Sequence, residues 1–185
     1  NNRVLETDLY GLKRRLEREK DEQKKKLGVV YRQYNRLFYK LDGYGYLPHE
    51  RWHLWVVDVR SGRSRQLTDH PVYDEQMPAW SPDGRWIVFV SNRSADPDAN
   101  PDAMYLYVMP AAGGELRQLP GPIGEKYLPS WSPDGRWIAY LGREGDGEDW
   151  RNQGVWVVPA DGSAAPRNLT EKYDLHASNW TINDL

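Results

Sequence analysis

The chain has 185 residues, which is enough for one domain with an appendage. Lys and Arg number 25 and Asp and Glu 27, so the net charge of −2 gives no general attraction to nucleic acid or to an anionic membrane. The absence of Cys excludes disulfides, thiolate metal sites and cysteine nucleophiles. No apolar run is long enough to span a membrane and no secretory signal opens the chain, so we expect a cytoplasmic protein without a membrane partner.

Residues 1–28 are predicted to form a charged amphipathic helix or a connector. Residues 17–26 contain no apolar side chain, which is typical of a solvated segment. Before them, four leucines follow one another at spacings of four, three and four, as on one face of a short helix: Leu5, Leu9, Leu12 and Leu16. The remaining residues, 29–185, are predicted to form a second unit.

Residues 31–40 interleave aromatic and basic side chains, a pattern that proteins binding single-stranded nucleic acid use. The same pattern is typical of an ordinary strand with one wet face. Because the chain as a whole is slightly acidic, we predict no nucleic-acid partner.

Residues 49–53 read His-Glu-Arg-Trp-His, the spacing with which a helix holds zinc between two imidazoles. Pro48 precedes the motif and a predicted strand starts at Leu54, which leaves room for barely one helical turn. In a strand, His49 and His53 would lie too far apart for one ion. His70 and His176 give no clear third ligand, so we predict no metal site.

Three sequence markers share one period of about 50 residues, the signature of a repeat architecture. Each marker occurs two or three times: Trp80–Ile87 and Trp131–Ile138; Arg65–Thr68, Arg117–Pro120 and Arg167–Thr170; Leu54–Val57, Leu106–Met109 and Val155–Val158. A degraded third copy of the first marker begins at Trp180.

The repeating unit is predicted to consist of antiparallel strands. Residues 85–90 and 136–141 are short β-branched and aromatic runs, and the Ser-Pro-Asp-Gly before each suits a type I turn. Glycines at 113, 114 and 162 mark a second hairpin in each unit. Four strands in about 50 residues predict a β-propeller blade. Tryptophans at repeat-equivalent positions are expected to pack between blades: Trp55, Trp80, Trp86, Trp131, Trp137, Trp156 and Trp180.

The fold class is therefore all-β, a partial β-propeller of about two and a half to three four-stranded blades. Its predicted parts are blade strands in 36–70, one blade in 71–120, one in 121–170 and the start of the next in 171–185. Because a propeller closes with about four to eight blades, we expect remaining blades elsewhere or self-association.

Two further motifs imitate functional sites. Asp96–Asp102 resembles the start of a calcium loop, but Pro101 stands where glycine is required and Tyr107 where glutamate is required. Ser64 has a glycine two residues before it but none two residues after it, so it does not form a nucleophile elbow. We predict no catalytic residue, no cofactor and no metal ligand on this chain.

Residues 78–93 and 106–119 resemble the repeats of TolB-like propellers, which also occur in peptidases of the prolyl oligopeptidase family. Residues 36–46, running into 53–59, narrow the resemblance to the acylaminoacyl peptidase and dipeptidyl aminopeptidase branch. The resemblance covers residues 29–185.

This resemblance implies a propeller that caps a C-terminal α/β-hydrolase domain and admits short peptides to its serine triad. The chain would then act as substrate gate and scaffold of a serine peptidase, with the hydrolase domain, the remaining blades and a peptide substrate as partners. The alternative is a non-enzymatic TolB-like propeller that binds a protein partner.

Overall fold

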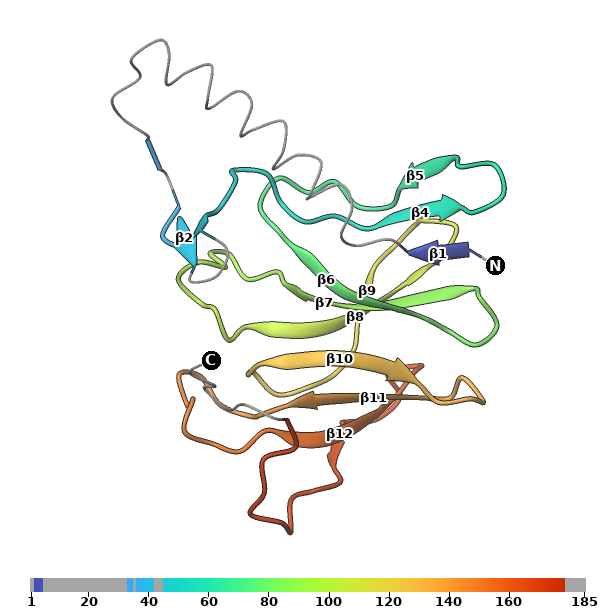
Figure 1. Cartoon of the computed structure of the whole chain (residues 1–185). Helices are drawn as coiled ribbons and strands as arrows, with labels where there is room; N and C mark the ends of the chain where they lie inside the picture. Colours follow the sequence, from blue (N-terminus) through green and yellow to red (C-terminus); the bar gives the residue numbers. More distant parts are fainter. Residues whose placement is uncertain (1, 5–32, 35, 42–44, 179–185) are drawn as a thin grey trace, which may run out of the picture.

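The computed structural model describes residues 2–4, 33–34, 36–41 and 45–178, and all regular structure within them is β-strand (Figure 1). The strands form three sheets stacked in chain order and one small hairpin. In the described residues no helix is long and apolar enough to cross a bilayer. The charged segment predicted at the N-terminus lies, beyond residues 2–4, outside the described residues, as does Trp180.

The second and third sheets confirm the predicted four-stranded antiparallel blades. In each sheet, sequential strands are neighbours, as hairpin connections require. The second sheet contains β6 (Glu75–Trp80), β7 (Trp86–Asn92), β8 (Met104–Pro110) and β9 (Arg117–Gln118). The third contains β10 (Lys126–Trp131), β11 (Trp137–Gly142), β12 (Gly154–Pro159) and β13 (Arg167–Asn168).

The first sheet is formed from distant parts of the chain. β1 (Asn2–Val4) pairs with β4 (Trp55–Asp58), which pairs with β5 (Ser64–Gln66). β2 (Lys40–Leu41) and β3 (Gly45–Tyr46) form a separate hairpin and do not join it. The strand beside β4 therefore comes from the N-terminal end of the chain, not from the residues directly before β4.

The Ser-Pro-Asp-Gly turns are held by one hydroxyl and one carboxylate. Gly84 N–H donates to the Ser81 carbonyl at 2.9 Å, and the Ser81 hydroxyl donates to Asp83 at 2.6 Å while accepting the Trp86 N–H at 2.9 Å. The Ser81 hydroxyl, followed by the Arg85 backbone N–H, lowers the pKa of Asp83 to about 2. Residues 132–137 repeat these hydrogen bonds.

Two apolar cores cover the two faces of the second sheet. Alternate residues of β7 and β8 point to opposite faces, so Val88 and Val108 pack toward the third sheet while Phe89 and Met109 pack toward the first. The third sheet contributes Ile138, Tyr140, Trp156 and Val158 to one core, and the first sheet contributes Leu54 and Val56 to the other. The second sheet thus resembles the interior of a stack, covered on both sides.

Among the described residues, the third sheet has another sheet on one face only. Along β11 the residues alternate between buried Ile138 and Tyr140 and half-buried Ala139 and Leu141. Trp156 and Trp131 pack in the core as predicted, whereas Trp86 and Trp137 are 39% and 37% exposed because they open their strands at the sheet margin.

Candidate functional site

A cavity of about 560 Å³ lies beside the second sheet, at the start of β6. It combines apolar walls with two arginines and three acidic side chains. The lining residues are Arg36, Phe38, Leu47, Pro48, Glu50, Arg51, Trp52, Asp74, Gln76, Met77, Asn92, Pro97, Asp98, Pro101 and Met104. We call this the rim cavity.

The two arginines of the rim cavity are fixed by ion pairs. Arg36 donates to both carboxylate oxygens of Asp98, at 3.1 and 3.3 Å, and Arg51 donates to Asp74 at 3.1 Å. Burial opposes ionisation of Asp98, but the hydrogen bond and charge of Arg36 outweigh it and hold its pKa below the usual value. The cavity thus presents guanidinium groups that are already neutralised and held in place, which suits positioning of a polar ligand better than proton transfer.

Beside the cavity, Glu75 is fully buried and bonded on both sides. His53 Nδ1 lies 3.0 Å from its carboxylate, and Arg93 forms an ion pair with the other oxygen. The Arg93 guanidinium also lies over the Tyr73 and Tyr107 rings, at 5.1 and 5.4 Å. Glu75 therefore joins the segment before β4 to the second sheet and has no contact with solvent.

The equivalent position one repeat later carries the opposite charge. Lys126 is 2% exposed and donates to the carbonyls of Met104, Pro122 and Gly124 at 2.6–3.0 Å. Burial lowers the pKa of its ammonium to about 8, against the opposing effect of Glu144. Glu75 with Arg93 and Lys126 with Glu144 are thus charge-reversed counterparts at the start of successive blades.

The first strands of the two blades share a strained bulge. Met77 and Leu128 have φ of 52° and 49°, a left-handed conformation that costs energy in residues other than glycine. The strand register shifts at both positions. The Leu128 N–H points to Met77 Sδ at 3.3 Å, and Leu128 is 64% exposed. Because β6 and β10 contact each other at the edges where the sheets converge, these bulges lie on the inner side of the stack.

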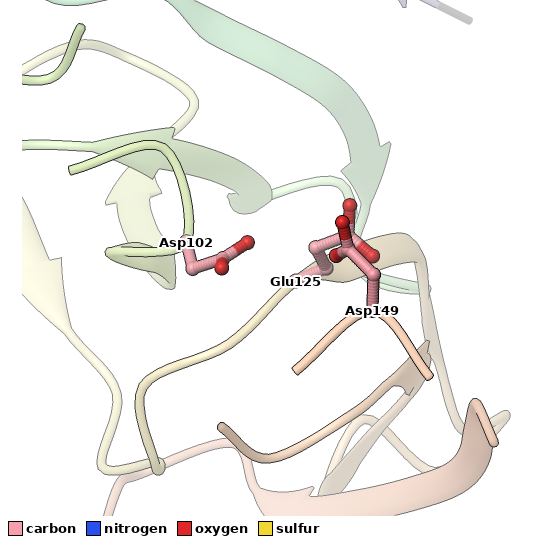
Figure 2. Close-up of side chains that lie close together, drawn as sticks. All are labelled: Asp102, Glu125 and Asp149. Atoms are coloured by element: carbon pink, nitrogen blue, oxygen red, sulfur yellow. The ribbon is translucent and has the colours of Figure 1, made fainter. Parts of the chain in front are cut away.

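Asp102, Glu125 and Asp149 gather at one point, with ligand atoms within 4.8 Å of one another (Figure 2). Arg143, which is 8% exposed, forms ion pairs with Glu125 at 2.6 Å and with Asp149. Gly147 N–H donates to Asp102 at 2.6 Å. Arg143 thus binds two of the three carboxylates and the Gly147 N–H binds the third, so each member of the cluster has a partner within the protein.

The residues that the sequence singled out do not converge. Residues 49–53 form no helix: the His49 ring is tilted against the Tyr34 ring, with centroids 6.3 Å apart, while His53 binds Glu75. Ser64 is exposed at the start of β5. Within the loop that resembles a calcium site, Asp98 and Asp102 bind different groups, Arg36 and Gly147.

Two aromatic side chains between 31 and 40, Tyr34 and Tyr39, pack on each other. Tyr34 lies 5.2 Å from Tyr39 and stacks on Tyr46 at 5.5 Å, measured between ring centroids. The three rings thus form an aromatic cluster, in which Tyr39 and Tyr46 are 47% and 53% exposed.

Sequence reasoning missed the rim cavity. Its ion pairs join residues 62 and 23 positions apart, and no spacing rule relates such positions. The one local signal was the cluster of acidic residues at 96–102, which supplies Asp98.

The fold is that of a β-propeller of the TolB-like kind. A TolB protein from Agrobacterium tumefaciens superimposes with a TM-score of 0.52 over 63% of this chain and 40% of that chain, at 24% identity. An oligogalacturonate lyase in complex with manganese gives a TM-score of 0.51 over 75% of this chain and 32% of that one, at 20% identity. At these identities the likeness concerns the fold alone.

Two curated relatives give more specific matches. Uncharacterized peptidase YuxL of Bacillus subtilis is 38% identical over 96 residues, which is 51% of this chain and 13% of that protein. The Tol-Pal system protein TolB of Anaeromyxobacter dehalogenans is 38% identical over 120 residues, which is 64% of this chain and 24% of that protein. No protein-family model matches the chain. The chain spans less than a quarter of the length of these relatives.

Proposed function

We propose that this chain is a propeller segment of a cytoplasmic serine peptidase of the prolyl oligopeptidase type, close to acylaminoacyl peptidases. It would act as substrate gate and scaffold and contribute no triad residue. The observation that carries the proposal is the 38% identity to a peptidase over 96 residues, in a chain whose sheets have propeller topology.

The inner strands offer a physical basis for gating. Leu128 projects from β10 with 64% of its surface exposed, and the bulge around it is repeated at Met77 on β6. Side chains on these strands would narrow the axis of a closed ring, so a short extended peptide would pass where a folded domain would not. The rim cavity, with Arg51 and Arg36 held by carboxylates, would contact polar groups of an entering peptide.

The decisive experiment is the nucleotide sequence downstream of the Leu185 codon. Further blades followed by Gly-x-Ser-x-Gly, and then by Asp and His in that order, support the peptidase. Blades without that motif, or an immediate stop codon, refute it. If the motif is present, Leu128→Gly in the whole polypeptide should raise kcat/KM for a peptide of about 20 residues more than for a dipeptide. Exposed Leu175→Gly provides the control, with no change in that ratio.

The second candidate is a non-enzymatic TolB-like propeller that binds a protein of a Tol-Pal system. The longer of the two curated matches, 120 residues with TolB, favours it. Cell fractionation separates the two: the peptidase is expected in the cytoplasm and a TolB-like protein in the periplasm.

A further inference from the structure

An arginine of the first sheet forms hydrogen bonds to a hairpin turn of the second sheet. Arg65, on β5, donates from Nη1 to the Ala112 carbonyl at 2.6 Å and from Nη2 to the Ala111 carbonyl at 3.0 Å. Both carbonyls belong to the turn between β8 and β9. A charged donor bonded to two carbonyls gives a stronger hydrogen bond than a neutral one would.

The same joint recurs between the second and third sheets. Arg117, on β9, donates from Nη2 to the Ala160 carbonyl at 2.8 Å, in the turn between β12 and β13. Arg117 occupies the position of Arg65 one repeat later, and Ala160 that of Ala111. Two independent copies of one contact make it a property of the repeat.

The glycine of each hairpin leaves room for the arginine. A Cβ on Gly113 would lie 3.2 Å from Arg65 Nη1, and a Cβ on Gly162 would lie 2.9 Å from Arg117 Nη1. Both glycines also have positive φ, 87° and 74°, which other residues rarely adopt. The same Cβ on Gly162 would also lie 3.6 Å from Leu119, the leucine two residues after the arginine.

A third copy of the Arg-x-Leu motif, Arg167 to Leu169, begins on β13 in the last of the described sheets. Arg167 lies over the Trp137 ring at 5.6 Å, and Leu169 is 51% exposed, whereas Leu119 in the occupied joint is 1% exposed. The adjoining face of the third sheet is apolar and half-buried, formed by Ala139, Leu141, Val155 and Val157. On the second sheet, the corresponding face is completely covered by its neighbour.

A second copy of this chain is a poor occupant for this surface. Its first sheet would offer the turn between β4 and β5, where Val59 is 63% exposed. In the two joints formed within the chain, the second residue after the strand is Ala112 or Asp161. In the turn between β4 and β5 it is Arg60, whose positive charge would repel Arg167. The glycine of that turn, Gly62, also comes one position later than in the other two.

We propose that Arg167 and Leu169 form a docking surface for a glycine hairpin of a further sheet of the same repeat. Its turn would carry glycine at the third position after the strand and a neutral or acidic residue at the second. The contact would be charge-assisted hydrogen bonding of Arg167 to one or two turn carbonyls, with Leu169 closing over the glycine. The inference is independent of the peptidase proposal, because it rests only on the repeated joint.

The test converts the first hairpin of this chain into the required occupant. Arg60→Asp with Ser61→Gly reproduces the Asp161–Gly162 turn, so one copy can dock onto the next. Sedimentation equilibrium should show self-association about tenfold tighter than in the unmodified chain. Adding Arg167→Ala should remove the gain, whereas adding Arg117→Ala, in a joint already occupied within the chain, should lower the thermal midpoint and leave the gain in association.

Two results would overturn the proposal. One is a doubly substituted chain with an unchanged thermal midpoint that associates no more tightly than the unmodified chain. The other is a gain in association that persists with Arg167→Ala. If the double variant does not fold, Arg60→Asp alone removes the repulsive charge, and it should give a smaller gain that also depends on Arg167.

Discussion

The buried ammonium of Lys126 should make the stability of this protein rise with pH in the alkaline range. Burial lowers its pKa from 10.5 to about 8, so between these values the unfolded chain binds a proton that the folded chain does not. Stability therefore increases as the pH rises through 8 and reaches its full value only above 10.5.

The magnitude follows from the size of the pKa shift. A shift of one pKa unit corresponds to about 1.4 kcal/mol, so the whole effect is about 3 kcal/mol, of which about 2 kcal/mol falls between pH 7 and 9.5. Measurements stay below pH 9.5 to limit interference from Tyr140. Burial raises the pKa of this phenol in the folded chain, so at higher pH it would ionise first in the unfolded chain and lower the stability.

The assay is urea denaturation followed by tryptophan fluorescence, at several pH values from 7 to 9.5, for the wild type and Lys126→Met. The variant leaves the carbonyls of Met104, Pro122 and Gly124 without their donor, so it should be less stable at pH 9.5. Its deficit should shrink by about 2 kcal/mol at pH 7, where the wild type carries the buried charge.

Lys172→Met is the matched control, because Lys172 is exposed. Its free energy of unfolding should follow the wild-type pH profile. Parallel profiles for the wild type and Lys126→Met would refute the reasoning, because Lys126 would then titrate alike in the folded and unfolded chains.

Three further predictions concern the repeat itself. Ser81→Ala should lower the free energy of unfolding by about 1 kcal/mol, because the Trp86 N–H loses its acceptor; urea titration measures this, and an unchanged midpoint would contradict it. Leu128→Gly should stabilise the protein by about 1 kcal/mol through relief of its positive φ, while Leu175→Gly, at a similarly exposed leucine, should show no such gain in thermal denaturation. Glu75→Gln should cost about 3 kcal/mol because Arg93 loses its buried counterion; a calorimetric loss below 1 kcal/mol would show that water replaces the carboxylate.

The local structure of the blades could be read from the sequence because it depends on neighbouring residues. Ser81–Gly84 contains the acceptor, proline and glycine that one turn requires, and the turn forms with the expected hydrogen bond. Glycines 113 and 162 have the positive φ expected of their hairpins. The period of about 50 residues then predicts that each set of four strands forms one sheet, as observed.

Contacts between residues far apart in sequence could not be predicted in this way. Nothing near Asn2–Val4 indicates that this segment pairs with β4, because Asn-Arg-Val contains a single β-branched residue and any short extended segment could fill that edge. The Arg36–Asp98 pair closes a loop of 62 residues, and the path of that loop decides the contact. The reversal of charge between Glu75 and Lys126 is visible in the sequence, but only burial gives it consequences.

The sequence by itself thus determined the strands and turns of the two four-stranded blades, the repeat and the propeller class, because each depends on hydrogen-bonding and packing preferences within about 50 residues. The tertiary structure alone decided which faces are covered. The strands β7 and β11 are similarly apolar, yet β7 is buried on both faces and β11 on one. Only the stacking of sheets distinguishes them, because burial depends on what lies opposite a side chain and not on the side chain itself.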